Sequence, residues 1–394
     1  MQRIERTDIL LADMFLEKPK PIHIYSGLVV GFLGELSKTL MADGETKKYP
    51  DVVTFAFWCR ESNLNRLEAW HHNKNCIGRG RVLHICPSNV PTVFAYSFAW
   101  GLLSGNSNIV KLPSRLYPQV KIICDAIEKL FKRDCYIALG KQNELIQYDK
   151  ENTTLTEELS LLADVRIVWG SDKTIAHIRS VPTKPRCVDV MFPDRYSLCI
   201  IDTNAPFATG LAQKFYNDTY TMDQNACSSP RLIVWTGNRV KEFKKYFWDS
   251  LDILVRAKYT LTQKQVSDKY TKLRVDAIEL DELINSISVH GTSIYRVNLS
   301  ELPENIDSLK ADSGYFYEYE TNDINSTVSI VNEKYQTLTY YGNGDFKNVL
   351  TSFVINNSLT GIDRIVPIGQ ALSMGVLWDG YDIIRTLSRI VDVK

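Results

Sequence analysis

The sequence has no long apolar run and no net charge of either sign. Its longest apolar-rich stretch, residues 93–103, is much shorter than the roughly 20 residues that a membrane-spanning helix needs. Residues 1–6 contain no apolar signal-peptide core. The 46 basic and 46 acidic side chains cancel, which argues against bulk binding of nucleic acid. We therefore expect a cytoplasmic protein without an integral membrane segment and without a nucleic-acid partner.

The sequence also lacks paired cysteines. Its eight cysteines are scattered, and none forms a Cys-x-x-Cys motif, so the pattern fits a reducing compartment better than a disulfide framework or a zinc site. His71, His72 and Cys76 superficially suggest metal ligands. Adjacent histidines on a helix point to different faces, however, and no second cluster completes a ligand set. We expect no metal site.

Strand-like and helix-like segments alternate along the chain. Candidate strands lie at residues 81–86, 108–112 and 165–169, and candidate helices lie at residues 92–103 and 122–130 and after residue 173. This order predicts a parallel sheet covered by helices, in which ligands bind at the carboxyl ends of the strands. The 394 residues exceed what one small core needs, so we expect two lobes. Residues 260–312 are polar and helix-rich and give few sharp signals.

Cys227 is the most informative candidate. It lies among the small polar residues 223–230, directly before the apolar run 232–235, which is typical of a turn that presents a thiol and a strand that anchors it. A cysteine used for packing would normally lie inside the apolar run. The thiolate is the best nucleophile among ordinary side chains. The alternative is a half-buried structural cysteine.

Three further turns carry candidate groups. The amide of Asn89, on a strand-to-helix turn, can donate to a developing oxyanion, although a helix cap is the alternative. Lys111, at a strand end beside a proline turn, can reach a ribose or phosphate, or is simply solvated. Gly170 and Ser171 form a small turn before a helix, which can hold a pyrophosphate; the alternative is an ordinary N-cap.

The order of these motifs resembles the aldehyde dehydrogenase superfamily, and most closely the acyl-CoA reductase family typified by the fatty-acid reductase of bacterial bioluminescence. The matching segments are residues 87–91, 105–111, 223–230, 336–339, 364–371 and 378–381. The similarity extends from about residue 84 to residue 394. It implies an α/β, aldehyde-dehydrogenase-like fold with a Rossmann-type parallel-sheet cofactor domain and a second α/β catalytic domain.

The resemblance also implies roles for the candidates. Cys227 would be the nucleophile that attacks an acyl thioester, and Asn89 with the Cys227 backbone N–H would form the oxyanion hole. Lys111 would contact the adenosine ribose of a nicotinamide cofactor, and Gly170 and Ser171 would lie near its pyrophosphate. Residues 367–369 would pack beside the catalytic turn.

Three further residues bear on the cofactor. Glu318 would bind the nicotinamide-side ribose, as a glutamate does elsewhere in the superfamily. Where NAD-selective members carry an acid that binds the ribose 2′-hydroxyl, this chain has Ser114 and Arg115. These residues tolerate or bind a 2′-phosphate, so we expect NADPH rather than NADH. The alternative for Arg115 is a solvent-facing residue at a helix start.

One departure from the superfamily favours reduction. Many oxidising members have a glutamate that activates the hydrolytic water, but the corresponding residues 190–196 contain none, and Asp189 would need a shift in the alignment. Without that base the acyl-enzyme should hydrolyse slowly and exchange its acyl group with a thiol instead.

These observations lead us to expect an NADPH-dependent reductase that converts a fatty acyl thioester, either acyl-CoA or acyl-protein, into the aldehyde through a Cys227 acyl-enzyme. A short-chain acylating or ordinary aldehyde dehydrogenase is the first alternative, and a non-catalytic scaffold in an acyl-transfer complex is the second. We expect a cofactor domain at residues 1–193 and a catalytic domain at 194–370. Residues 371–394 would pack back on the cofactor domain or at an oligomer interface. The resemblance implies a homo-oligomer and an acyl-protein synthetase or transferase as partner.

Overall fold

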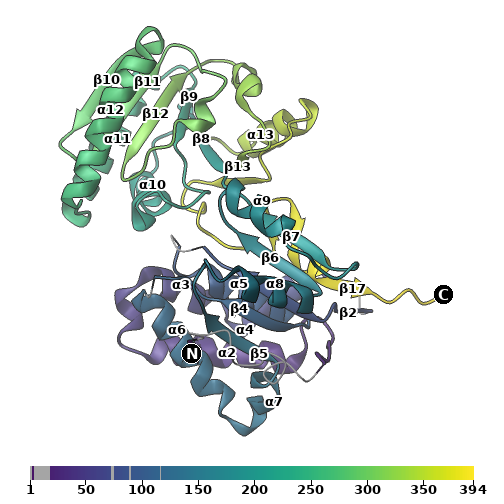
Figure 1. The fold of residues 1–394 in the computed structure, drawn as a ribbon. Helices are drawn as coiled ribbons and strands as arrows, with labels where there is room; N and C mark the ends of the chain where they lie inside the picture. The colour runs from purple at the N-terminus through teal and green to yellow at the C-terminus, as the bar shows by residue number, and fades with distance from the viewer. Residues whose placement is uncertain (1, 4–17, 72–74, 88–89, 116) are drawn as a thin grey trace. The chain divides into compact units, whose positions relative to one another are not determined.

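The computed structural model describes residues 2–3, 18–71, 75–87, 90–115 and 117–394, so His72 and Asn89 lie outside the described residues. The chain forms two compact units, and Figure 1 labels most of their helices and strands. Unit 1 comprises residues 1–193 and 375–394, and unit 2 comprises residues 194–374. Within the described ranges, no helix is both long enough and apolar enough to cross a membrane.

Unit 1 is built around a six-stranded sheet in which every neighbouring pair of strands is parallel. In sheet order the strands are β1 (Gln2–Arg3), β5 (Asn143–Gln147), β4 (Ser107–Lys111), β3 (Arg81–Ile85), β6 (Val165–Trp169) and β7 (Val188–Phe192). Both β3 and β4 are buried along their whole length, as expected for strands covered on both faces. The sequence predicts a parallel sheet with strands at residues 81–86, 108–112 and 165–169. Strands β3, β4 and β6 confirm this prediction.

Helices cover both faces of this sheet. Leu83 and Ile85 of β3 join a buried cluster with residues of α8 and α9. His84 lies between them and therefore points to the opposite face, where its Nδ1 atom lies 2.7 Å from Oγ of Ser97 in α5. Among the described residues before 193, the α-helices are α2 (Gly27–Ala42), α3 (Pro50–Trp58), α4 (Glu61–Glu68), α5 (Val93–Leu103), α6 (Pro118–Phe131), α7 (Ile137–Gly140), α8 (Thr153–Leu162) and α9 (Asp172–Ser180).

Residues 375–394 complete unit 1. They form β15 (Leu377–Trp378), β16 (Tyr381–Asp382), α14 (Ile383–Leu387) and β17 (Ser388–Ile390). Strand β17 pairs antiparallel with β2 (Cys76–Gly78). The Nε2 atom of His71 lies 3.1 Å from Oδ1 of Asp382, so this histidine ties the last segment of unit 1 to the first.

Unit 2 contains a seven-stranded sheet in which only the β10–β11 pair is antiparallel. In sheet order the strands are β10 (Ile284–His290), β11 (Ile294–Leu299), β12 (Tyr315–Glu320), β9 (Leu232–Thr236), β8 (Tyr196–Asp202), β13 (Tyr335–Tyr341) and β14 (Arg364–Pro367). Its α-helices are α10 (Leu211–Thr219), α11 (Val240–Lys258), α12 (Gln263–Glu279) and α13 (Phe346–Asn356). Strand β9 is the predicted anchor strand after Cys227.

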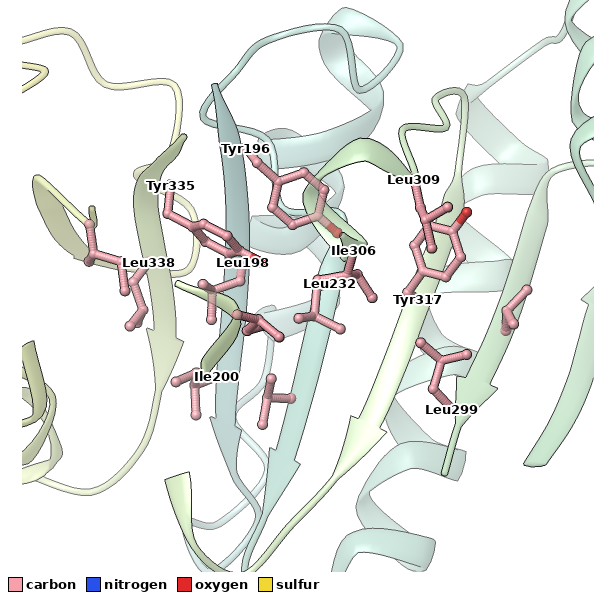
Figure 2. Packing of buried hydrophobic residues seen from close by; sticks show 14 of the residues in the cluster. Tyr196, Leu198, Ile200, Leu232, Leu299, Ile306, Leu309, Tyr317, Tyr335 and Leu338 are labelled. Carbon is pink, nitrogen blue, oxygen red and sulfur yellow. The ribbon is translucent and has the colours of Figure 1, made fainter. Parts of the chain in front are cut away.

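Alternate residues of each central strand of unit 2 enter two separate buried clusters. Leu232 and Val234 of β9 belong to the first cluster, and Ile233 and Trp235 belong to the second, because successive side chains of a strand point to opposite faces. Figure 2 shows the first cluster, in which Tyr196 and leucines from several strands lie side by side. Both faces of the sheet are therefore covered by apolar side chains.

Helix α12 buries two charged side chains inside unit 2, and its Leu273 packs, partly buried, against the first cluster. The fully buried residues of this helix are Lys269 and Asp276. Their partners are the main-chain oxygens of Thr292, Ser293 and Ser313 for the Lys269 ammonium, and the hydroxyls of Tyr315 and Tyr317 for the Asp276 carboxylate. Burial lowers the pKa of Lys269 to about 7. Buried charges need such partners, because each would otherwise be costly.

Candidate active site

The segment of residues 223–230, which we call the thiol turn, presents Cys227 at the start of β9. Asp223 and Gln224 have φ angles of 50° and 60°, a left-handed conformation that few side-chain-bearing residues adopt. They reverse the chain after the short helix Tyr220–Met222. The N–H of Ser229 donates to the oxygen of Ala226 at 3.0 Å, so a closed turn surrounds Cys227. The cysteine itself is half-buried.

Gln224 fixes the thiol turn to the start of β12. Its side chain is fully buried, and its Oε1 atom accepts the N–H groups of Gly314 at 3.1 Å and Tyr315 at 3.2 Å. Its Nε2 atom donates to the oxygens of Pro230 at 3.0 Å and Tyr315 at 3.1 Å. One side-chain amide therefore satisfies four main-chain groups, as a buried amide must.

Two residues outside the turn hold its main chain. Oγ of Ser197, at the start of β8, donates to the oxygen of Cys227 at 2.7 Å and accepts the N–H of Thr337 at 3.1 Å. Arg231 donates from Nη2 to the oxygen of Gln224 at 2.8 Å. Since Ser197 and Thr337 lie near the amino ends of β8 and β13, the thiol turn lies at the amino-terminal edge of the unit 2 sheet.

A second contact joins the thiol turn to α10 and to the loop of residues 367–371. Oγ of Ser229 donates to the main-chain oxygen of Asp218 at 2.7 Å. The Asp218 carboxylate accepts the N–H groups of Gly369 at 2.6 Å and Ala371 at 3.0 Å. Burial raises the pKa of Asp218 to about 7, while the two N–H donors and Arg364 act in the opposite direction.

Lys111 ends β4 at the carboxyl edge of the unit 1 sheet. Its side chain is largely buried, and its Nζ atom lies 4.0 Å from the ring centre of Tyr148. Burial lowers the pKa of Lys111, and Asp149 raises it to a smaller extent. The cation–π contact orients the ammonium beside the end of the strand.

Ser114 and Arg115 follow Lys111 and are exposed. Nε2 of Gln147 donates to the main-chain oxygens of Pro113 at 3.1 Å and Ser114 at 3.2 Å, which fixes this loop from the neighbouring strand β5. The Arg115 guanidinium lies 4.8 Å from the ring centre of Tyr117. The arginine is therefore presented outward on a supported loop.

Gly170 and Ser171 lie between β6 and α9. Ser171 is the N-cap of α9, and its Oγ atom accepts the N–H of Thr174 at 3.3 Å. A Cβ atom at Gly170 would lie 2.8 Å from the side chain of Thr174, so this approach of chain to helix requires glycine. Lys111 and Gly170 lie at the same edge of the sheet, because β4 and β6 are both parallel neighbours of β3.

Glu318 lies inside unit 2 rather than at a surface. It is 2% exposed, and Oε1 accepts the indole N–H groups of Trp235 at 2.8 Å and Trp248 at 3.0 Å. Lys244 and Arg296 form ion pairs with it, each at 3.4 Å. This environment leaves no carboxylate oxygen exposed to a ribose, so we leave Glu318 out of the proposed cofactor site.

Sequence reasoning did not identify Ser197, Asp218 or the side-chain role of Gln224. Gln224 belongs to the segment that drew attention to Cys227, but nothing in the sequence near Ser197 or Asp218 distinguishes them from ordinary polar residues. Their contacts form only when the strands and helices assemble. In the described part of the chain, no group of three histidine, cysteine, aspartate or glutamate side chains is placed to hold a metal ion.

The chain is similar to known reductases and dehydrogenases. The family described as acyl-CoA reductase (LuxC) matches residues 63–391. The long-chain acyl-protein thioester reductase of Vibrio harveyi is 24% identical over 324 residues, which are 79% of this chain and 63% of that protein. The match therefore spans less than two thirds of that relative.

Solved structures show the same fold. A NAD-dependent benzaldehyde dehydrogenase from Corynebacterium glutamicum superposes with a TM-score of 0.64 at 11% identity, over 92% of this chain and 83% of that one. The substrate-bound AldH of Staphylococcus aureus superposes with a TM-score of 0.60 at 13% identity, over 92% and 88% of the two chains. The expected aldehyde-dehydrogenase-like α/β fold is confirmed.

Proposed function

The chain belongs to the acyl-CoA reductase (LuxC) family, and we propose that it reduces a fatty acyl thioester to the aldehyde with NADPH, through an acyl-enzyme on Cys227. The observation that carries this proposal is the thiol turn. A half-buried cysteine lies on a turn whose main chain is held by Ser197, Gln224 and Arg231. Supported geometry of this kind is what a nucleophile needs if it is to meet a carbonyl at a fixed angle.

In the proposed reaction the Cys227 thiolate attacks the thioester carbonyl. The amide of Asn89 and the backbone N–H of Cys227 stabilise the tetrahedral oxyanion, and its collapse expels the carrier thiol and leaves the acyl group on sulfur. After hydride addition to the acyl carbon, the thiohemiacetal on Cys227 releases the aldehyde and restores the thiol.

NADPH would supply the hydride, and the carboxyl edge of the unit 1 sheet fits such a cofactor. The N-terminus of α9 can bind a pyrophosphate, and Gly170 lets the chain pass close to Thr174 in the first turn of that helix. Lys111 would bind the adenosine ribose, and Ser114 and Arg115 would bind its 2′-phosphate.

The absence of a glutamate from residues 190–196 supports reduction over oxidation. Asp189 directly precedes residues 190–196, where oxidising relatives carry a glutamate, and Asp194 inside that stretch forms an ion pair with Lys310. Asp189 lies on β7, and Arg166 binds both of its oxygens, at 2.8 Å from Nε and 2.7 Å from Nη2. The guanidinium occupies both carboxylate oxygens, so Asp189 is not free to activate a water, and the acyl-enzyme would persist long enough to be reduced.

The name of the Vibrio harveyi relative supports an acyl-protein as donor, and acyl-CoA is the other donor that we propose to test. We further propose an acyl-protein synthetase or transferase as partner, a homo-oligomeric state and a cytoplasmic location. The named alternatives, a short-chain acylating or ordinary aldehyde dehydrogenase and a scaffold, predict different outcomes in the experiment below.

The test combines intact-protein mass spectrometry with NADPH oxidation, using acyl-CoA donors of graded chain length. Wild type and the exposed-thiol control Cys135→Ala should gain the mass of one acyl group and oxidise NADPH fastest with long chains, whereas Cys227→Ala should do neither. A preference for short chains would favour the acylating dehydrogenase. Acyl labelling that persists in Cys227→Ala would refute the assignment of the nucleophile.

A further inference from the structure

We infer that Asp218 is a positioning residue, which couples the thiol turn to the loop of residues 367–371. This inference rests on the proposed function, because it concerns the placement of Cys227. Asp218 lies in the last turns of α10 and is 1% exposed. It contacts both segments through different atoms, so a shift in one segment is transmitted to the other through a single residue.

The carboxylate holds the loop. Each of its oxygens accepts one main-chain N–H, from Gly369 at 2.6 Å and from Ala371 at 3.0 Å. Gly369 has a φ angle of +98°, and a Cβ atom there would lie 2.9 Å from the side chain of Lys214 in α10. Only glycine can bring the loop this close to the helix in this conformation.

Arg364 holds the other side of the same loop. It donates to the main-chain oxygens of Ala371 at 3.1 Å and Ser373 at 2.9 Å. The charged and titratable groups that act on one another here are the Asp218 carboxylate, the Arg364 guanidinium and the thiol of Cys199. The loop is thus seated between a buried carboxylate and a guanidinium.

The main-chain oxygen of Asp218 holds the thiol turn. It accepts the Oγ hydrogen of Ser229 at 2.7 Å, and the N–H of Ser229 closes the turn around Cys227 by donating to Ala226 at 3.0 Å. Ser229 is therefore both the closing residue of the turn and its link to α10. A second hydrogen bond, from the N–H of Gln224 to the oxygen of Thr219 at 2.7 Å, also ties the turn to the end of α10.

Packing alone gives no reason for a carboxylate at this position. The carboxyl end of a helix carries partial negative charge, and burial adds a desolvation cost, so an apolar residue would fill the space at lower cost. What the carboxylate adds is two acceptors for two N–H groups of the loop, those of Gly369 and Ala371. We assign to the Asp218 carboxylate the role of keeping this loop in a fixed position relative to the thiol turn.

Hydrogen exchange measured by mass spectrometry tests the coupling without any need for activity. Asp218→Asn removes the charge and one of the two acceptors. Amide exchange should accelerate by about 10-fold or more in peptides that cover residues 366–372 and in those that cover 226–231. The control Asp249→Asn, an exposed position on α11, should leave both peptides unchanged. Acceleration confined to residues 366–372 would overturn the inference.

Steady-state kinetics provide a second readout. In Asp218→Asn, kcat should fall by roughly 10- to 100-fold while KM changes by less than about twofold, because the substrate site itself is intact. An unchanged kcat in a folded variant would contradict a positioning role. Failure of wild type to form an acyl-enzyme would refute the proposed function, yet the exchange result would still report on the coupling.

Ser229→Ala covers the case in which Asp218→Asn unfolds. This substitution removes only the Oγ donor to Asp218, so the fold should persist. Exchange should accelerate in residues 226–231 and also in residues 366–372, although the loop keeps all of its own hydrogen bonds. Acceleration in residues 226–231 alone would show that the two segments are independent and would overturn the inference.

Discussion

Ser197 and Cys227 are joined by a hydrogen bond of 2.7 Å from the serine Oγ atom to the main-chain oxygen of the cysteine. The same Oγ atom accepts the N–H of Thr337, so strand β13 and the thiol turn share one hydroxyl. This bond fixes the peptide that follows Cys227, and with it the direction in which the sulfur is presented.

Ser197→Ala should therefore reduce kcat by about 10-fold and cost about 1 kcal/mol of unfolding free energy. It deletes one hydroxyl and leaves the oxygen of Cys227 without this donor. Urea unfolding and acylation rates measure the two effects. Ser308→Ala, at an exposed serine of unit 2, is the matched control, and equal kinetics for the two variants would argue against this prediction.

Gln224→Leu should destabilise unit 2 by about 2–4 kcal/mol. The substitution keeps most of the side-chain volume but strands up to four buried main-chain groups, each of which costs part of its desolvation energy. Urea-induced unfolding followed by tryptophan fluorescence measures the change. Gln263→Leu, at an exposed position in the first turn of α12, should change stability by less than about 0.5 kcal/mol. If both variants lost a similar amount of unfolding free energy, the buried amide of Gln224 would not be a source of stability.

Arg115→Asp should weaken NADPH binding by about 10-fold or more and affect NADH little. The substitution places a negative charge where the 2′-phosphate would lie, and that charge repels the phosphate but not a 2′-hydroxyl. Fluorescence titration with each cofactor measures the two dissociation constants. Arg66→Glu, at an exposed arginine on α4, controls for the change in total charge. Equal weakening of both cofactors would place Arg115 outside the 2′-phosphate site.

Asp218 should make stability depend on pH. Its pKa of about 7 in the folded protein lies well above the value of about 4 of an exposed aspartate. Between these values the folded state holds a proton that the unfolded chain releases, so the contribution of Asp218 to stability declines as pH rises from about 4 to about 7. The melting temperature of wild type minus that of Asp218→Asn should therefore be smaller at pH 8 than at pH 5, by on the order of 5 °C. A difference that stays constant or grows with pH would contradict the shift.

The sequence predicts the central strands well because each of them falls in a short run that is rich in apolar residues. Strands β3, β4, β6 and β9 all lie where such runs occur, and the turns after β4 and β6 follow at once. The turn that carries Cys227 is predicted for the same reason, since an apolar strand directly follows a short polar segment.

The region of α12 is harder to predict because its docking residues look like solvent-exposed ones. Lys269 and Asp276 would be placed on the outer face of any amphipathic helix, yet both are buried. Their partners come from loops and strands farther along the chain. Glu318 is the converse case, because a polar residue assigned to a ligand instead pairs with two indoles and two cations inside unit 2. Whether these polar side chains are buried depends on contacts between segments that are distant in the sequence.

Strand β17 adds a constraint on synthesis. Its partner β2 leaves the ribosome about three hundred residues earlier, and unit 2 is one uninterrupted segment between them. Translation therefore delivers all of unit 2 before the hydrogen bonds of β2 can be completed. A released chain truncated after residue 387 should still protect unit 2 from protease, although β2 lacks its β17 partner.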